Sequence, residues 1–226
     1  MKRLNLLWLV AFATMIIATV GCSSTQTETP TQGIITVENG QFMRNGEPYY
    51  FVGTNFWYGA ILGSEGEGGN RERLIKELDF MKENGIDNLR VLVGGEGENG
   101  LLGKIEPNLQ TAPGVYNDDV LAGLDFLMME LGKRNMTAVL YFNNAWEWSG
   151  GYTQYVAWAN ETPVLVPRID GWFSYNTFAG EFVRNERAKQ IFYDHVRYIV
   201  SRTNRYTGVK YIDDPAIFSW QISNEP

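Results

Sequence analysis

Eight side chains that could bind or react with a ligand lie at the ends of four apolar runs in the sequence. They are Asn55, Trp57, Arg90, Asn143, Asn144, Trp146, Asn224 and Glu225. A carboxyl group whose pKa is raised above that of free glutamate can protonate a leaving oxygen, and neutral amides can bind hydroxyl groups. Indole rings offer flat apolar faces with a polar edge, which suits the C–H faces of pyranose rings. These residue types together point to a site for a sugar.

The runs that carry these residues alternate with amphipathic helical patterns. We expect strands over residues 48–57, 87–95, 136–144 and 216–226. We expect helices over 71–84 (between an Asn70 N-cap and a Gly85 C-cap), 118–134 and 181–204. Such alternation predicts parallel βαβ units. The predicted fold class is α/β, a TIM (β/α)8 barrel of which this chain supplies about the first four β/α units, because a barrel brings all strand ends to one face.

The segment from residue 143 to 180 is longer than a connection between a strand and a helix needs, which usually marks a functional loop. It holds Trp146, Trp148, Trp158 and Trp172. We expect about half of these rings to pack on the barrel rim and half to contact ligand.

An open Rossmann-type sheet is the alternative winding. Residues 95–100, "GEGENG", satisfy the pattern G-x-G-x-x-G of dinucleotide-binding proteins. A helix should open inside that motif, yet Pro107 and Pro113 follow it, and Glu96 and Glu98 would face a pyrophosphate with like charge. The match is therefore interpreted as chance.

Composition excludes several other classes of site. The formal net charge is −7, which disfavours nucleic acid as a partner. The single cysteine, Cys22, and the single histidine, His195, rule out an internal disulfide, a Cys/His metal cluster and most Ser-His-Asp arrangements. We expect no cofactor and no metal, and His195 is expected in the outer helical layer. We expect the domain to act as a monomer.

The N-terminus has the composition of an export signal. "MKR" precedes an apolar run that ends at "GCSS", so residues 1–21 are predicted to be a signal peptide. The small residue before the lone Cys22 resembles a bacterial lipoprotein signal, which implies a lipid anchor on Cys22 and an outer-membrane or cell-surface location. An ordinary secretory signal is the alternative. Residues 22–32 read as a flexible linker and 33–226 as one catalytic domain.

Four segments, in order along the chain, carry a family resemblance. "GTNFWY", "LRVLV", "NNAWEWSGGYTQYVAWA" and "SWQISNEP" resemble glycoside hydrolase family 5, and most closely its endo-β-1,4-mannanase branch. The resemblance runs from about residue 34 to the end. It implies a TIM barrel that hydrolyses β-glycosidic bonds of mannan-type plant polysaccharides with retention of configuration.

The resemblance also implies roles for single residues. Glu225 matches the general acid/base, and Asn224 matches the partner of the sugar 2-hydroxyl. The other matched positions line the substrate cleft or orient the nucleophile: Trp57, Arg90, Asn143, Asn144 and Trp146. Asparagine at 143 or 144, where many relatives place histidine, suits the mannanase branch better than the cellulase branch.

The residues around Glu225 suggest how it could serve as an acid. Burial beside Trp220 and a neighbouring carboxylate could raise its pKa. Pro226 biases Glu225 towards an extended backbone. Arg90, within an apolar strand, is expected to pair with a carboxylate, which would be the nucleophile.

Retaining hydrolysis needs a second carboxylate about 5–5.5 Å from the first. The candidates in the chain lie in loops and are expected to be solvated rim acids: Glu65, Glu67, Glu96, Glu98 and Glu147. With four strands of the eight in a barrel, we expect the nucleophile to lie beyond residue 226 and this fragment to be inactive. Two alternatives remain open. One is another β-glycanase of the same family, such as a cellulase or xyloglucanase, and the other is a sugar-binding lipoprotein without turnover.

Overall fold

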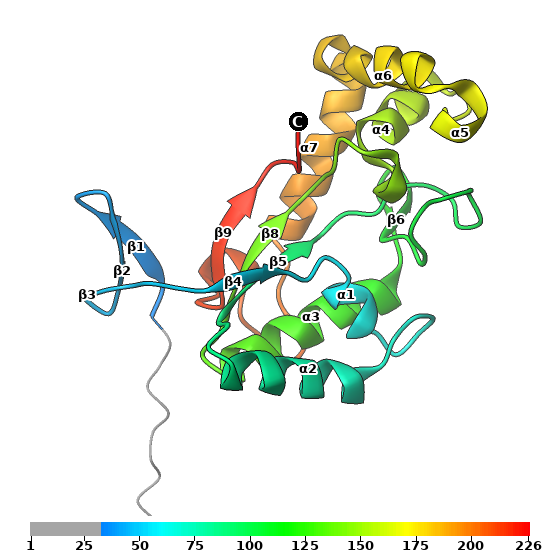
Figure 1. The fold of residues 1–226 in the computed structure, drawn as a ribbon. Helices are drawn as coiled ribbons and strands as arrows, with labels where there is room; N and C mark the ends of the chain where they lie inside the picture. Colours follow the sequence, from blue (N-terminus) through cyan, green and yellow to red (C-terminus); the bar gives the residue numbers. More distant parts are fainter. Residues whose placement is uncertain (1–32) are drawn as a thin grey trace, which may run out of the picture. The chain divides into compact units, whose positions relative to one another are not determined.

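A parallel four-stranded sheet lies at the centre of residues 33–226 (Figure 1). The computed structural model describes residues 33–226, so the signal peptide, the lipidated Cys22 and the linker predicted for residues 1–32 lie outside the described residues. The order of strands in the sheet equals their order along the chain: β4 (Gly53–Asn55), β5 (Asn88–Leu92), β8 (Thr137–Tyr141) and β9 (Ile217–Gln221).

The register brings the carboxyl ends of these strands together. Arg90 on β5 pairs with Val139 on β8, which pairs with Ser219 on β9. Beyond the ends of β8 and β9, Asn144 and Asn224 form one further parallel bridge. The polar residues that follow the strands in the sequence are therefore neighbours in space.

Helices connect the strands and cover the sheet. They are α1 (Gly59–Leu62), α2 (Arg71–Glu83), α3 (Asp118–Lys133), α4 (Gly151–Asn160), α5 (Pro167–Asp170), α6 (Trp172–Gly180) and α7 (Glu186–Val200). The predicted N-cap of α2 is confirmed, because the Asn70 side chain accepts a hydrogen bond from the Arg73 amide at 2.9 Å. No helix among residues 33–226 is long and apolar enough to cross a lipid bilayer.

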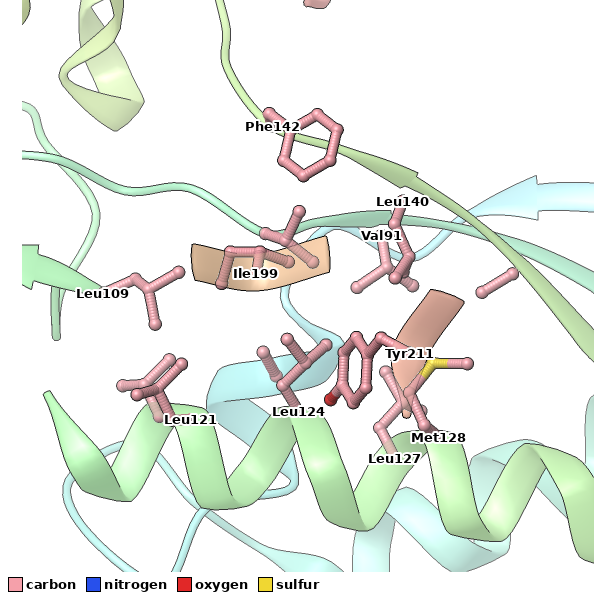
Figure 2. Close-up of a cluster of buried hydrophobic side chains, with 14 of the residues drawn as sticks. Val91, Leu109, Leu121, Leu124, Leu127, Met128, Leu140, Phe142, Ile199 and Tyr211 are labelled. Atoms are coloured by element: carbon pink, nitrogen blue, oxygen red, sulfur yellow. The ribbon is translucent and has the colours of Figure 1, made fainter. Parts of the chain in front are cut away.

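The hydrophobic core lies between the sheet and its helices. Figure 2 shows the leucine stripe of α3 facing side chains from the strands above it. Five of these side chains are fully buried: Leu124, Leu127, Leu131, Val91 and Leu140. The amphipathic pattern predicts a helix over 118–134, and α3 follows this range to within one residue.

The long segment 143–180 was expected as a loop, and this expectation is wrong. The segment contains a 3₁₀ helix, Glu147–Ser149, and the helices α4, α5 and α6. Tyr155 and Val156 of α4 are fully buried, and the Tyr155 ring packs edge-on against Phe192 of α7. Burial of α4 thus fixes much of the segment onto the barrel.

Two small antiparallel sheets accompany the parallel one. The first joins β1 (Ile35–Glu38), β2 (Gln41–Arg44) and β3 (Glu47–Pro48), and the second joins β6 (Gln110–Ala112) and β7 (Val115–Tyr116). The first sheet is tied to the parallel sheet by aromatic contacts, since the Phe42 ring lies edge-on to Phe218 of β9 at 4.9 Å. The strand predicted over 48–57 shortens to β4, because only residues 53–55 pair with β5.

Candidate active site

Arg90 is the centre of a polar network at the carboxyl ends of the strands. Its guanidinium donates to the side-chain amide oxygens of Gln221 at 2.9 Å, Asn224 at 3.0 Å and Asn55 at 3.3 Å. The guanidinium also lies over the Tyr141 ring, 4.1 Å from its centroid. Burial raises the pKa of Tyr141 to about 12, so this ring remains neutral. Among residues 33–226 no carboxylate pairs with Arg90, and three amide dipoles and a ring face compensate its charge. The expected pairing of Arg90 with a nucleophile beyond residue 226 stays a prediction.

Asn224 links this network to the end of β8. Its amide nitrogen Nδ2 donates to Asn144 Oδ1 at 3.0 Å, while its Oδ1 accepts from Arg90. The backbone repeats the connection, since Asn224 N donates to Asn143 O at 2.8 Å and Ala145 N donates to Asn224 O at 3.0 Å. Asn143 and Asn144 are fully buried. Asn224 is therefore held at both ends of its side chain and on both sides of its backbone.

Glu225 follows Asn224 and is held by a tryptophan. Trp146 donates a hydrogen bond from its indole Nε1 to the Glu225 carboxylate. The structure corrects two expectations. Glu225 is exposed and is not enclosed beside Trp220, whose ring stacks on Phe142 instead, and its φ of 46° is left-handed, not extended. This backbone conformation departs from the preference of a residue before proline.

Four tryptophan rings form two edge-on pairs, and one pair includes the Trp146 that binds Glu225. Trp146 contacts Trp172 of α6 edge-on at 5.9 Å, and Trp57 contacts Trp148 edge-on at 5.3 Å. Trp57, Trp146 and Trp172 are 37%, 43% and 47% exposed, which leaves ring surface free for a ligand. Among the tryptophans of segment 143–180, Trp158 instead packs against Tyr155 in the core. The sequence analysis does not include Trp148 and Trp172 among the predicted site residues, although the high density of tryptophan in this segment could have indicated them.

The other carboxylates have separate environments. Glu65 forms an ion pair with Arg71, and Glu67 and Glu98 are exposed. Glu96 departs from the expectation of a solvated acid, because it is fully buried and accepts hydrogen bonds from Gly151 N and the Tyr155 hydroxyl, both at 3.1 Å. Glu147 is partly buried. In the described part of the chain, no carboxylate is hydrogen-bonded or ion-paired to Arg90.

His195 lies outside this site. His195 is fully buried on α7, with Nε2 at 2.8 Å from Val93 O and Nδ1 at 3.3 Å from the Tyr116 hydroxyl. Within residues 33–226, no group of three or more His, Cys, Asp or Glu side chains is placed to hold a metal ion. The chemistry available at the strand ends is that of one carboxyl group, several amides, a guanidinium and aromatic faces.

Comparison with known proteins decides the family. The profile of the family described as "GH family 5 beta-mannosidase-like" matches residues 32–226. The chain belongs to glycoside hydrolase family 5. A family 5 mannosidase from Rhizomucor miehei is 37% identical, with a TM-score of 0.80 over 87% of this chain and 49% of its own. A mutant of that mannosidase, solved in complex with mannosyl-fructose, is 36% identical to this chain, with a TM-score of 0.82 and the same coverage of both chains.

A curated relative of glycoside hydrolase family 5 agrees with these structures. The putative mannan endo-1,4-beta-mannosidase 9 of Oryza sativa subsp. japonica is 31% identical over 199 residues, which cover 84% of this chain and 44% of that protein. The chain thus spans about half the length of the relatives it matches. The predicted resemblance and the predicted fold, the first part of a TIM barrel, are both confirmed.

Proposed function

We propose that Glu225 is the general acid/base of a retaining endo-β-1,4-mannanase that hydrolyses mannan-type polysaccharides. The observation that carries this proposal is the position of Glu225. It receives a hydrogen bond from Trp146 and follows Asn224, whose side chain is fixed between Arg90 and Asn144. A carboxyl group at a strand end, next to an immobilised amide and exposed indole faces, has what glycosidic bond cleavage needs on the side of the leaving group.

Asn224 is suited to bind the sugar ring. Its side-chain nitrogen has two hydrogens, and one of them is used by Asn144 Oδ1. The other hydrogen is available to a hydroxyl of the sugar next to the scissile bond. Because the Arg90 guanidinium can only donate hydrogen bonds and donates one to the Asn224 oxygen, the amide orientation is set before substrate arrives. In this mechanism Glu225 donates a proton to the leaving glycosidic oxygen and later takes one from the attacking water.

The second carboxylate of the reaction remains part of the proposal. Arg90 would orient it, as the resemblance implies, and among residues 33–226 no carboxylate occupies that place. We therefore propose that the 226 residues alone bind β-mannan chains without hydrolysing them. The mannan backbone is supported by the mannan endo-1,4-beta-mannosidase relatives and by the mannosyl-fructose complex of the Rhizomucor miehei mannosidase.

The test has a binding arm and a turnover arm. In the first, isothermal titration of the 226-residue chain with mannohexaose and cellohexaose should show binding that favours mannohexaose. A preference for cellohexaose would refute mannan specificity. In the second, the complete reading frame that contains these residues should release mannooligosaccharides from insoluble mannan. Glu225→Gln should lower kcat by at least two orders of magnitude, whereas Glu98→Gln, a change at an exposed acid, should not. Full activity of Glu225→Gln would overturn the acid/base assignment.

Export and lipid anchoring through Cys22 stay part of the proposal. The support is the sequence of residues 1–24 alone. Growth of the native host with radiolabelled palmitate should label the protein, and Cys22→Ala should abolish the label. A labelled Cys22→Ala variant would refute the anchor.

A further inference from the structure

Glu96 is a buried acid that the proposed reaction does not use. It lies in the Gly-rich segment 94–100 after β5 and is 0% exposed. Its two carboxylate oxygens accept hydrogen bonds from the amide of Gly151, the first residue of α4, and from the hydroxyl of Tyr155, one turn into that helix. A fully buried acid without an ion pair is costly, so a structure that keeps one needs a physical explanation.

The surroundings of Glu96 join two loops. Glu96 N donates to Ser149 O at 2.9 Å, and Ile105 N donates to Trp148 O at 2.7 Å. The two backbone segments approach so closely at Gly150, which has a φ of 91°, that an added Cβ would lie 2.1 Å from the Glu96 carbonyl oxygen. The segment after β5 therefore holds the turn 146–151 through the backbone at Trp148 and Ser149, and through the Glu96 carboxyl at Gly151.

The turn held in this way carries rings of the candidate site. Trp148 packs edge-on against Trp57, and Trp146 donates to Glu225. A movement of the turn would shift both tryptophans, and with Trp146 it would shift the only hydrogen bond seen on the Glu225 carboxylate among residues 33–226.

The charged and titratable groups around Glu96 come from each element packed against it. Tyr155 of α4 and Tyr116 of β7 remain neutral, since burial raises both pKa values. Lys104 lies in the same loop as Glu96, with Nζ 3.2 Å from Gln154 Oε1, and burial lowers its pKa to about 8 against the attraction of Glu96 and Glu147. Burial raises the pKa of Glu96 to about 7, although its hydrogen bonds and Lys104 oppose the shift.

We propose that Glu96 is a positioning residue whose carboxyl holds the turn 146–151 in the conformation that places Trp146 and Trp148, and that ionisation of this buried group favours an opened, hydrated turn. The holding of the turn follows from the contacts alone. Only its consequence for sugar binding rests on the proposed function. The direction of the pH effect follows from linkage. The Glu96 carboxylate binds a proton more tightly when the turn is closed than when it is open and hydrated, so rising pH favours the open turn.

The first experiment follows the turn without any sugar. Hydrogen exchange measured by NMR gives the protection factor of the Gly151 amide, which donates directly to Glu96. In the 226-residue chain this factor should fall on the order of 50-fold between pH 5 and pH 8, which follows from a closed-state pKa of about 7 and an open-state value near 4.5. Glu96→Gln, which cannot ionise, should keep the protection high across this range. Glu98→Gln, an exposed acid in the same loop, should behave as wild type.

A protection factor for wild type that does not change with pH would overturn the proposal, whether or not Glu96→Gln folds. Lys104→Met offers a second variant. It removes the cation that favours the ionised form, so protection at pH 8 should fall below that of wild type. Equal protection in the two proteins would contradict the electrostatic part of the argument.

The second experiment separates this inference from the proposed function. The affinity for mannohexaose, measured from pH 5 to pH 8, should fall in wild type and in Glu98→Gln but remain constant in Glu96→Gln. If Gly151 protection behaves as expected and no mannohexaose binds at any pH, the proposed function fails and the role of Glu96 in holding the turn stands. If mannohexaose binds while the protection and the affinity are both independent of pH, the role of Glu96 fails alone.

Discussion

Two buried groups should give this protein opposite dependences of stability on pH, and the substitution Glu96→Gln should expose one of them. His195 and Glu96 are both fully buried. Burial lowers the pKa of His195 to about 4 and raises that of Glu96 to about 7. The ring of His195 stays neutral on folding, with Nε2–H donating to Val93 O, the tautomer that the hydrogen bonds favour.

The signs of the two effects can be worked out separately. The unfolded state binds more protons at His195 between pH 4 and 6.5, so His195 contributes stability that is present above pH 6.5 and lost as the pH falls towards 4. The folded state binds more protons at Glu96 between pH 4.5 and 7, so Glu96 contributes stability that is present at low pH and lost as the pH rises through 7.

The magnitudes nearly cancel. A shift of one pKa unit corresponds to about 1.4 kcal/mol, so each group changes the free energy of unfolding by about 2.5 kcal/mol between pH 7.5 and pH 4.5. As the pH falls from 7.5 to 4.5, the free energy of unfolding of Glu96→Gln should therefore decrease by about 2.5 kcal/mol relative to wild type. That of His195→Gln should increase by about the same amount. The double variant should again follow the profile of wild type.

Urea unfolding followed by circular dichroism at pH 4.5, 6 and 7.5 measures these differences for the four proteins. Because every other titrating group is shared, the difference between variant and wild type isolates the substituted residue. Parallel profiles for Glu96→Gln and wild type would refute the reasoning, since they would mean that Glu96 titrates in the folded protein as it does in water.

Three further predictions concern single contacts. Arg90→Met removes the donor shared by three amide oxygens and should lower the free energy of unfolding by about 3 kcal/mol in urea unfolding, together with mannohexaose affinity; an unchanged stability would contradict the network. Asp125→Asn leaves the mostly buried Arg202 without its partner carboxylate and should cost roughly 3 kcal/mol in the same assay, where a loss below about 1 kcal/mol would show that the pair is not needed. Trp172→Ala should weaken mannohexaose binding about fivefold in isothermal titration, with thermal stability nearly unchanged, while Phe173→Ala on the same helix should leave the affinity unaltered; equal losses would argue against a specific role of Trp172.

The order of strands and helices could be predicted because each element carries a local signal. Apolar runs mark β5 and β8, and an amphipathic pattern marks α3. The position of the site followed from the same elements, because parallel strands bring their carboxyl ends together. Arg90, Asn144 and Asn224 were chosen from the sequence, and the structure brings them into one network.

Other features left weaker signals or none. Helix α4 is buried on nearly every side, from Thr153 to Ala159, so its sequence has no one-sided apolar stripe that would indicate a helix. The β1–β2 hairpin could have been predicted from Asn39-Gly40, which form its turn with positive φ at both residues. The left-handed backbone of Glu225 goes against the extended conformation expected before Pro226, and no local pattern in the sequence indicates it.

The pairing of Arg90 with amides has a consequence for how one site could hold two acids of different strength. A cation in contact with a carboxylate lowers the pKa of that carboxylate, which suits a nucleophile and would disable a general acid. In this structure the guanidinium reaches Asn224 and not Glu225, and the Glu225 carboxylate receives a neutral indole donor. The Asn224 amide thus separates the proposed acid from the charge, while the cation polarises the amide and strengthens its remaining N–H as a donor to a sugar hydroxyl. An aspartate at 224 would not serve in this arrangement, because it would form an ion pair with Arg90 itself and would have no N–H to offer the proposed substrate.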